Sequence, residues 1–184
     1  VEARGIWPEH QRTLAYFLIL KPNGQDRPIG LLPSLIRIWE TIQAPIMHRW
    51  LREQDMPWDW CAEGRASDEA AWDTLLRQEA AGDVSGTWEP EEVTVTCVMD
   101  LVKAFEKLPH HLIIEAAVRL KYCLYTLRLS LAAYRLPRTS GIDGAYSRLV
   151  IAALGITAGA VPATTELRLV VHQAVLGPLT AWPH

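Results

Sequence analysis

The sequence has few cysteines and no long apolar run, and these two shortages exclude several classes of protein. Its three cysteines, Cys61, Cys97 and Cys123, lie far apart and form no Cys-x-x-Cys pair, so neither a disulfide framework nor a zinc site is indicated. We therefore expect a reducing compartment. Because no apolar run reaches the roughly 18 residues that a membrane span needs, and no basic-then-apolar signal pattern opens the chain, we expect a soluble protein without a membrane partner.

An excess of positive charge is also absent. The formal net charge of the 184 residues is −3 at pH 7, which excludes a broadly basic nucleic-acid coat, so any phosphate binding must come from a few local lysines and arginines. Hydrophobic residues make up 49% of the chain, enough for one domain with a core or a large part of a bigger one. Because the chain begins with Val1 and ends at His184 without tail character, we expect both ends to be cut from something longer.

The N-terminal part predicts a β-hairpin. Residues 13–20, "TLAYFLIL", and residues 27–32, "RPIGLL", have the composition of two strands. Asn23 and Gly24 stand between them, and both residue types tolerate positive φ, which makes this pair a strong hairpin signal.

Two helices are expected after the hairpin. The first follows Ser34 and is expected to kink or split at Pro45, because proline removes a helical hydrogen bond. Its apolar residues at helical spacing are Leu35, Trp39, Ile42, Ile46 and Trp50. The second is expected from Ser67, as its N-cap, to about Ala81. Its buried side chains are expected to be Trp72, Leu75 and Leu76.

The C-terminal half predicts a buried strand that ends on a charge. Residues 93–100, "VTVTCVMD", are β-branched and mostly apolar and end at Asp100. A carboxylate at the end of a strand is poorly explained by packing. Helices are expected over 109–122 and 124–134, and a last helix is expected from a cap at Thr164 or Thr165.

Between the last two helices, the stretch "RTSGIDGAYSRLVIAALGITAG" predicts a turn, then the strand "YSRLVI", and then a second short strand into a glycine-flanked bend. This order of elements indicates an α+β fold, with hairpins and a mixed sheet packed by helices. A boundary between residues 1–92 and 93–184 is expected after the acidic, turn-rich segment 82–92.

Four blocks resemble, in order, the successive blocks of a reverse transcriptase, and they are most similar to the LINE-type retrotransposon enzymes. The blocks are "FLILKPNGQDRPIGLLPSLIRIWE", "EGRASDEAAWDTL", "CVMDLVKAFEKLPHHLI" and "GITAGAVPATTEL", within residues 13–176. One block alone is weak, since "DxxKAF" also fits a strand followed by an amphipathic turn. The resemblance implies a right-hand polymerase with fingers in 1–92 and a partial palm in 93–184.

The resemblance implies a role for the two cations that flank the hairpin tip. Nucleotidyl transfer develops negative charge on the triphosphate, so cations must meet the β and γ phosphates. In the resembled family a Lys and an Arg at the positions of Lys21 and Arg27 fold over the incoming nucleotide, and Arg can make a forked contact that Lys cannot. The alternative is an ordinary exposed hairpin with solvated charges.

The resemblance also implies a metal site at the end of the buried strand. Two divalent ions, Mg²⁺ or Mn²⁺, clamp the attacking and leaving oxygens and need bridging carboxylates. Asp100 matches the first metal aspartate of the palm, and the backbone carbonyl of Leu101 is expected on the same metal. Phe105 matches the bulky residue that rejects a ribose 2′ hydroxyl, although a core aromatic is the alternative. Glu106 departs from the commoner Asp and is not assigned to metal.

Two further positions are expected to lie near nucleotide or template. Gly159 matches the palm glycine whose backbone passes close beneath the nucleotide, but Ala158 stands where the family commonly has Gln. Arg65, in "EGRAS", matches a block whose Arg and small residues touch template. His110 and His111 are not expected to form a metal pair, because adjacent residues do not share a helix face.

The largest departure from the family is that no Asp-Asp pair occurs in the sequence. These polymerases need an aromatic-x-Asp-Asp hairpin as their second carboxylate cluster, so we expect the 184-residue chain alone to be inactive. The implied partners of a whole enzyme are an RNA template, a DNA primer and deoxynucleoside triphosphates. An intact element is compatible with a nuclear location. The alternative is a non-catalytic remnant that acts as an RNA-binding or interaction domain.

Overall fold

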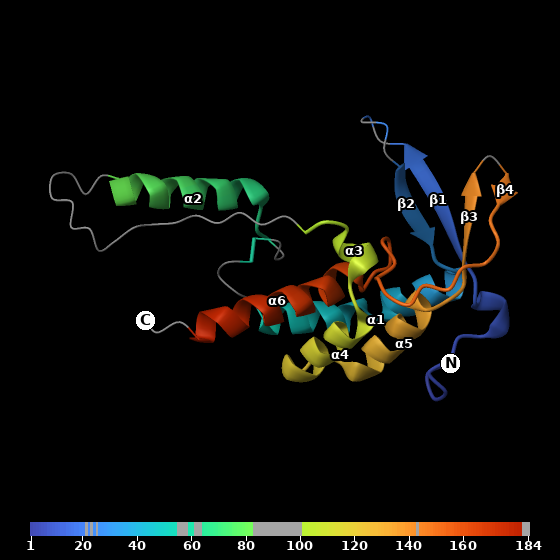
Figure 1. Ribbon diagram of the computed structural model, residues 1–184. Helices are drawn as coiled ribbons and strands as arrows, with labels where there is room; N and C mark the ends of the chain where they lie inside the picture. Colours follow the sequence, from blue (N-terminus) through green and yellow to red (C-terminus); the bar gives the residue numbers. More distant parts are fainter. Residues whose placement is uncertain are drawn as a thin grey trace. The chain divides into compact units, whose positions relative to one another are not determined.

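The computed structural model describes residues 1–20, 22, 24, 26–54, 59–60, 64–82, 101–142 and 144–181 (Figure 1). The chain forms two compact units. Unit 1 comprises Val1–Trp50 and Val102–His184, and unit 2 comprises Leu51–Leu101. The expected boundary at residue 92 and the expected strand 93–100 both lie outside the described residues.

Unit 1 contains a four-stranded mixed sheet in the order β2-β1-β3-β4. β1 (Leu14–Leu20) pairs antiparallel with β2 (Asp26–Leu31) and parallel with β3 (Arg138–Ile142), and β3 pairs antiparallel with β4 (Ala145–Tyr146). The expected strands of the hairpin and the expected α+β class are therefore confirmed. The parallel pairing joins the beginning of the chain to a segment far along it (Figure 1).

The strand β3 corrects the expectation of a turn at "RTSG". Only Thr139 and Ile142 of residues 138–142 favour a strand, while the other three, Gly141 among them, do not, so the local signal for a strand is weak. Pairing with β1 overrides this propensity, since the backbone N–H of Leu14 donates to the carbonyl of Pro137 at 2.9 Å. The strand expected at "YSRLVI" is also largely wrong, because β4 ends at Tyr146 and only an isolated bridge joins Val150 to Arg138.

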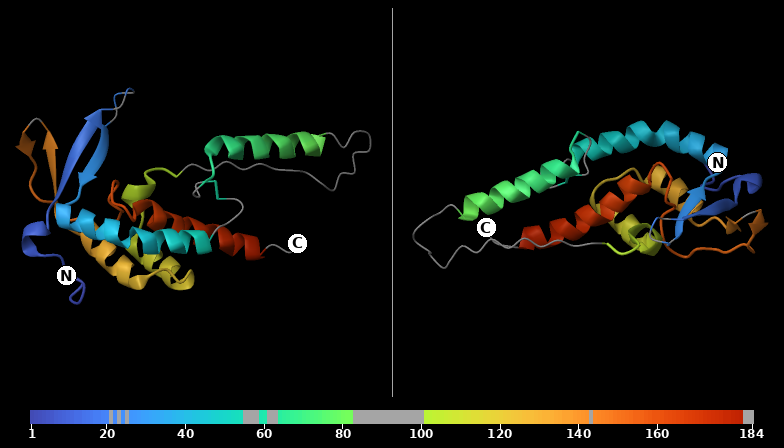
Figure 2. Two further views of the ribbon diagram at one scale, coloured as in Figure 1. Left: turned by 180° about the vertical axis from the view of Figure 1, so that it is seen from behind. Right: turned by 90° about the horizontal axis from the view of Figure 1, so that it is seen from above.

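Helices of unit 1 lie side by side at one end of the sheet (Figure 2). A 3-10 turn η1 (Glu9–Gln11) and a short helix α3 (Ala104–Lys107) accompany four longer ones: α1 (Ser34–Glu53), α4 (His110–Arg119), α5 (Leu124–Tyr134) and α6 (Ala163–Ala181). Their positions confirm the four expected helices of this part. Among the described helices, none is long and apolar enough to cross a membrane.

The helix α1 differs from its expected form in two ways. It runs unbroken through Pro45, so the expected split is wrong. Pro45 lies on the exposed side, where the carbonyl that loses its helical partner can reach water. The buried face is also rotated from the expected one, since Leu35, Ile42 and Ile46 are exposed. The buried residues are instead Ile36, Trp39, Glu40, Gln43, Met47 and Trp50.

Two tryptophans anchor the core of unit 1 through their indole N–H groups. Trp7 is buried and donates to the carbonyl of Leu129 at 3.2 Å, and Trp50 donates to the carbonyl of Leu120 at 2.9 Å. Each bond satisfies a polar atom that burial would otherwise leave without a partner. The tryptophans therefore serve packing, as their helical or strand-flanking positions suggest.

In unit 2, the helix α2 (Ser67–Gly82) confirms the second expected helix. The Glu69 carboxylate accepts a hydrogen bond from the backbone N–H of Ala66 at 3.0 Å, which satisfies a donor at the helix start. The expected burial of Trp72, Leu75 and Leu76 is wrong, because all three are exposed. An amphipathic pattern shows that one face of a helix can be buried. Whether that face is buried depends on another element packing against it.

The end of α4 supports a stability prediction. Lys121 has φ 54°, and the backbone N–H of Tyr122 donates to the carbonyl of Ala117 at 2.8 Å. This is a Schellman end with lysine where glycine is favoured. We expect Lys121→Gly to raise the free energy of unfolding by roughly 0.5–1 kcal/mol, measured by urea denaturation. Arg119→Gly, inside the helix, is the control and is expected to lower it by a similar amount.

Candidate functional site

The two charged residues expected to bind phosphate and metal most directly are not described by the structure. Lys21 and Asp100 lie outside the described residues. The backbone of Arg27 is part of β2, but its side chain is outside the described part. These three expected roles therefore stay predictions.

Two expected site residues lie in unit 2. Arg65 donates a hydrogen bond from Nη1 to the backbone carbonyl of Asp59 at 3.0 Å, and Leu101 is exposed at the end of the unit. The arginine contact joins Arg65 to the backbone of Asp59 ahead of α2. Its expected template contact stays a prediction.

Within unit 1, Phe105 on α3 lies beside the glycine-flanked bend. The backbone N–H of Ile156 donates to the carbonyl of Phe105 at 2.6 Å, and the N–H of Gly155 donates to the carbonyl of Leu108 at 2.8 Å. Gly155 has φ 91°, and a Cβ there would lie 2.6 Å from the carbonyl oxygen of Glu106. Only glycine permits so close an approach of two backbones. The third and fourth sequence blocks are therefore joined directly.

The same bend also lies against the hairpin. A Cβ on Gly30 would lie 2.6 Å from Cγ2 of Thr157, and a Cβ on Gly159 would lie 3.3 Å from the carbonyl oxygen of Gly30. Gly159 itself has φ 99°, a conformation in which other residues are strained. Because β2 is an edge strand, the backbone around Gly159 meets the hairpin at the border of the sheet.

A turn with unusual backbone geometry leads into α3. Lys103 occupies the N-cap position with φ 54° and ψ 48°, the left-handed region. The N–H of Lys107 donates to the carbonyl of Lys103 at 3.0 Å, which closes the turn. A non-glycine residue in this region is uncommon and is held there by its surroundings. The chain thus turns sharply just before Phe105.

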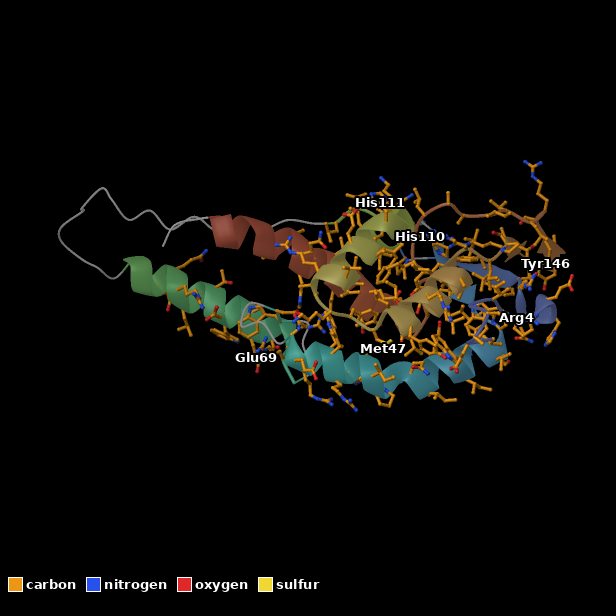
Figure 3. The ribbon with its side chains drawn as sticks, turned by 90° about the horizontal axis from the view of Figure 1, so that it is seen from below. Arg4, Met47, Glu69, His110, His111 and Tyr146 are labelled. Carbon is orange, nitrogen blue, oxygen red and sulfur yellow. The ribbon has the colours of Figure 1, made fainter. Side chains whose placement is uncertain are left out.

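One face of the sheet carries exposed aromatic rings. The strand register pairs Gly141 with both Phe17 and Tyr146, and a Cβ on Gly141 would lie 3.3 Å from the Phe17 ring and 3.0 Å from the Tyr146 ring. The two rings flank a glycine, and 37% of Phe17 and 64% of Tyr146 are exposed. Tyr146 is labelled in Figure 3. Arg27 pairs with Ile19, two positions from Phe17 on β1, so its position lies on the same face.

A buried histidine holds the bend from the helix side. His110 accepts a hydrogen bond from Nε of Arg135 at Nδ1, at 3.1 Å, and its Nε2 donates to the carbonyl of Gly155 at 2.9 Å. This arrangement requires a neutral ring with its proton on Nε2. Burial lowers the pKa of His110, and the nearby Arg135 and Arg138 lower it further. His111, in contrast, is exposed (Figure 3), so the two histidines lie on different faces.

Sequence reasoning missed two buried acids. Glu40 on α1 accepts a hydrogen bond from the backbone N–H of Val161 at 3.2 Å, and burial raises the pKa of Glu40 to about 7. Burial also raises the pKa of Glu166 on α6 to about 8, and the neighbouring hydroxyl groups of Tyr134 and Ser130 lower it in part. A sequence signal for Glu40 existed, because Glu40 and Gln43 fall within a 4-3-4-3 spacing with the apolar residues Ile36, Met47 and Trp50.

The metal site expected from the sequence cannot be built from the described residues. No group of three or more His, Cys, Asp or Glu in that part of the chain could hold a metal ion. The expected donors, the carboxylate of Asp100 and the carbonyl of Leu101, are both oxygens, the type of ligand that Mg²⁺ and Mn²⁺ accept. A single carboxylate, however, is too few to hold two ions.

Compared with known proteins, the chain matches no protein-family model and no curated protein. The functional inference therefore depends on the residues and on the contacts between them.

Proposed function

We propose that this chain is the fingers and partial palm of a LINE-type RNA-directed DNA polymerase. The observation that supports the proposal is the meeting of three sequence blocks in unit 1. The backbone carbonyl of Phe105 accepts a hydrogen bond from the N–H of Ile156 in the bend, and Gly159 of that bend lies against Gly30 of the hairpin. A reverse transcriptase needs these blocks together, because the hairpin, the sugar-sensing residue and the palm glycine surround one nucleotide.

The proposed chemistry is transfer of a deoxynucleotide to the 3′ hydroxyl of a primer. Lys21 and Arg27 would neutralise charge on the triphosphate. Asp100 and the carbonyl of Leu101 would hold Mg²⁺ or Mn²⁺, which supplies charge stabilisation at the reacting phosphate. The ring of Phe105 would exclude a ribose 2′ hydroxyl, and the backbone around Gly159 would leave room for the nucleotide.

The exposed sheet face supports a nucleic-acid partner. Phe17 and Tyr146 present aromatic rings on the face that also includes the position of Arg27. Aromatic rings beside a cation are suited to stacking of unpaired bases and to phosphate contact. The unpaired bases of an RNA template ahead of the primer would meet these requirements, and with a net charge of −3 the phosphate contacts would fall to a few local cations.

A second candidate is a non-catalytic remnant that binds RNA or protein. It is favoured by the lack of any Asp-Asp pair and by Ala158 and Glu106, which depart from the family pattern. It differs from the first candidate in one respect that can be measured, since it predicts binding without DNA synthesis.

Primer extension on an RNA template tests the proposal. The assay compares the 184-residue chain with the product of the whole open reading frame that contains it, with Mg²⁺ or Mn²⁺. We expect synthesis only where an aromatic-x-Asp-Asp block is encoded. In that protein, Asp100→Asn should reduce synthesis at least about 100-fold, and Phe105→Val should increase incorporation of ribonucleotides relative to deoxyribonucleotides.

Glu115→Gln, on an exposed part of α4, is the matched control and should leave synthesis unchanged. Synthesis that persists after Asp100→Asn would overturn the proposed metal role. An open reading frame whose product binds RNA but makes no DNA would favour the remnant. Asp100-dependent synthesis by the 184-residue chain alone would refute the expectation that this chain is inactive.

A further inference from the structure

A buried carboxylate connects α1 to the bend that carries Gly159. Glu40 is 1% exposed, and its Oε2 accepts the backbone N–H of Val161 at 3.2 Å. The bond joins residues far apart in sequence, and Val161 belongs to the turn between Gly159 and α6. Because both groups are buried, water does not compete for this hydrogen bond, whether the carboxyl group is neutral or charged.

Hydrogen bonds between its own backbone groups also shape the bend. The N–H of Ala160 donates to the carbonyl of Thr157 at 3.0 Å, and the N–H of Ala163 donates to the carbonyl of Ala160 at 3.2 Å. These bonds shape the bend internally. Contact with α1 comes from Glu40, whereas His110 holds the opposite end of the bend at Gly155.

Packing alone does not explain a glutamate at this position. The neighbouring buried positions on α1 include Ile36 and Met47, and an apolar side chain would avoid the cost of burying a carboxyl group. Gln43 is the other buried polar residue on this face. Its Oε1 accepts a hydrogen bond from the Thr126 hydroxyl at 3.4 Å, so Gln43 contacts α5 and not the bend. Glu40 is the residue of this face that reaches the backbone of the bend.

We propose that Glu40 is a positioning residue: its carboxylate fixes the turn at Val161 and thereby sets where the backbone of Gly159 meets a bound nucleotide. The second part of this inference rests on the proposed function. The first part, the holding of the turn, stands on the hydrogen bond and its burial.

Amide hydrogen exchange on the 184-residue chain tests the holding of the turn. Glu40→Leu removes the acceptor, and we expect exchange at Val161, and at Ala160, whose N–H donates to the carbonyl of Thr157, to become about 10- to 100-fold faster, relative to amides of α5. Glu40→Gln retains an acceptor oxygen at the same reach and should keep Val161 protected. Gln43→Leu is the matched control, because it removes a buried polar group from the same face without touching the bend.

Equal acceleration throughout unit 1 in Glu40→Leu, or the same effect from Gln43→Leu, would overturn the inference. If Glu40→Leu does not fold, Glu40→Asp provides the same test, since its shorter side chain keeps the carboxylate but cannot reach Val161. Protection of Val161 that persists in Glu40→Asp would then overturn it.

Nucleotide binding separates this inference from the proposed function. Adding a deoxynucleoside triphosphate with Mg²⁺ should shift the amide resonance of Gly159 in the wild type and in Glu40→Gln, and the shift should be lost in Glu40→Leu or Glu40→Asp. An unchanged shift in those two variants would overturn the positioning of Gly159. No shift in the wild type would count against the proposed function and against the role toward nucleotide, while the exchange result would still decide whether Glu40 holds the turn.

Discussion

Gly155→Ala is expected to lower the free energy of unfolding by roughly 3 kcal/mol or more. Gly155 has φ 91°, and an added Cβ would lie 2.6 Å from the carbonyl oxygen of Glu106 and 3.0 Å from that of Phe105. Neither obstacle is a flexible side chain, so the two backbones must separate. Separation would break the hydrogen bonds from Gly155 to Leu108 and from Ile156 to Phe105. Urea denaturation followed by circular dichroism measures the change.

Gly144→Ala is the matched control for this substitution. Gly144 has a similar φ of 82°, but a Cβ there would meet nothing within 4 Å. Gly144→Ala should therefore lower the free energy of unfolding only by the backbone strain, about 1–2 kcal/mol. If Gly155→Ala costs no more than Gly144→Ala, the contact between α3 and the bend is not tight, and the joining of Phe105 to the glycine block loses its structural support.

The stability of unit 1 is expected to fall as the pH rises from about 5 to about 9. Burial raises the pKa of Glu40 to about 7 and that of Glu166 to about 8, from the ordinary value of 4.5. The folded state then binds more protons than the unfolded state between these values, so the free energy of unfolding decreases with pH. The loss is up to about 3 kcal/mol for Glu40 and about 5 kcal/mol for Glu166.

Burial is the main reason why the pKa of Glu166 is raised. Its side chain is fully buried beside the hydroxyl groups of Tyr134 and Ser130, and the charge of Glu40 raises its pKa further. These hydroxyls favour the charged form, but burial dominates. His110 acts in the opposite direction below its ordinary pKa, because burial favours its neutral form. The greatest stability is therefore expected on the mildly acidic side of neutrality.

Unfolding by urea at several pH values between 5 and 9 measures this dependence. Glu166→Gln removes one of the two titrating groups and should flatten the decline. Glu115→Gln, at an exposed glutamate of α4, is the control and should leave the decline as it is. A wild type whose stability rises steadily from pH 5 to 9 would show that neither acid is held in its neutral form.

The expected hairpin and helices depend on local chemistry, which is why sequence analysis found them. Apolar and aromatic composition on either side of Asn23 and Gly24 predicted β1 and β2, and helical spacing predicted α5 within its observed bounds, Leu124–Tyr134. Each of these signals lies within a short window of the chain. The order of the four blocks likewise directed attention to Phe105 and Gly159, which the structure brings to the same bend.

The sequence by itself thus determined the mixed α+β class and most of the elements in the part of the chain that the structure describes. The tertiary structure alone decided the strand β3, whose residues pair with β1 despite weak local propensity. It also decided the buried face of α1, where Glu40 and Gln43 interrupt the apolar pattern. The physical reason is common to both cases: strand pairing and burial depend on distant partners, and a short stretch of sequence specifies its own backbone preferences but not the surface that will cover it.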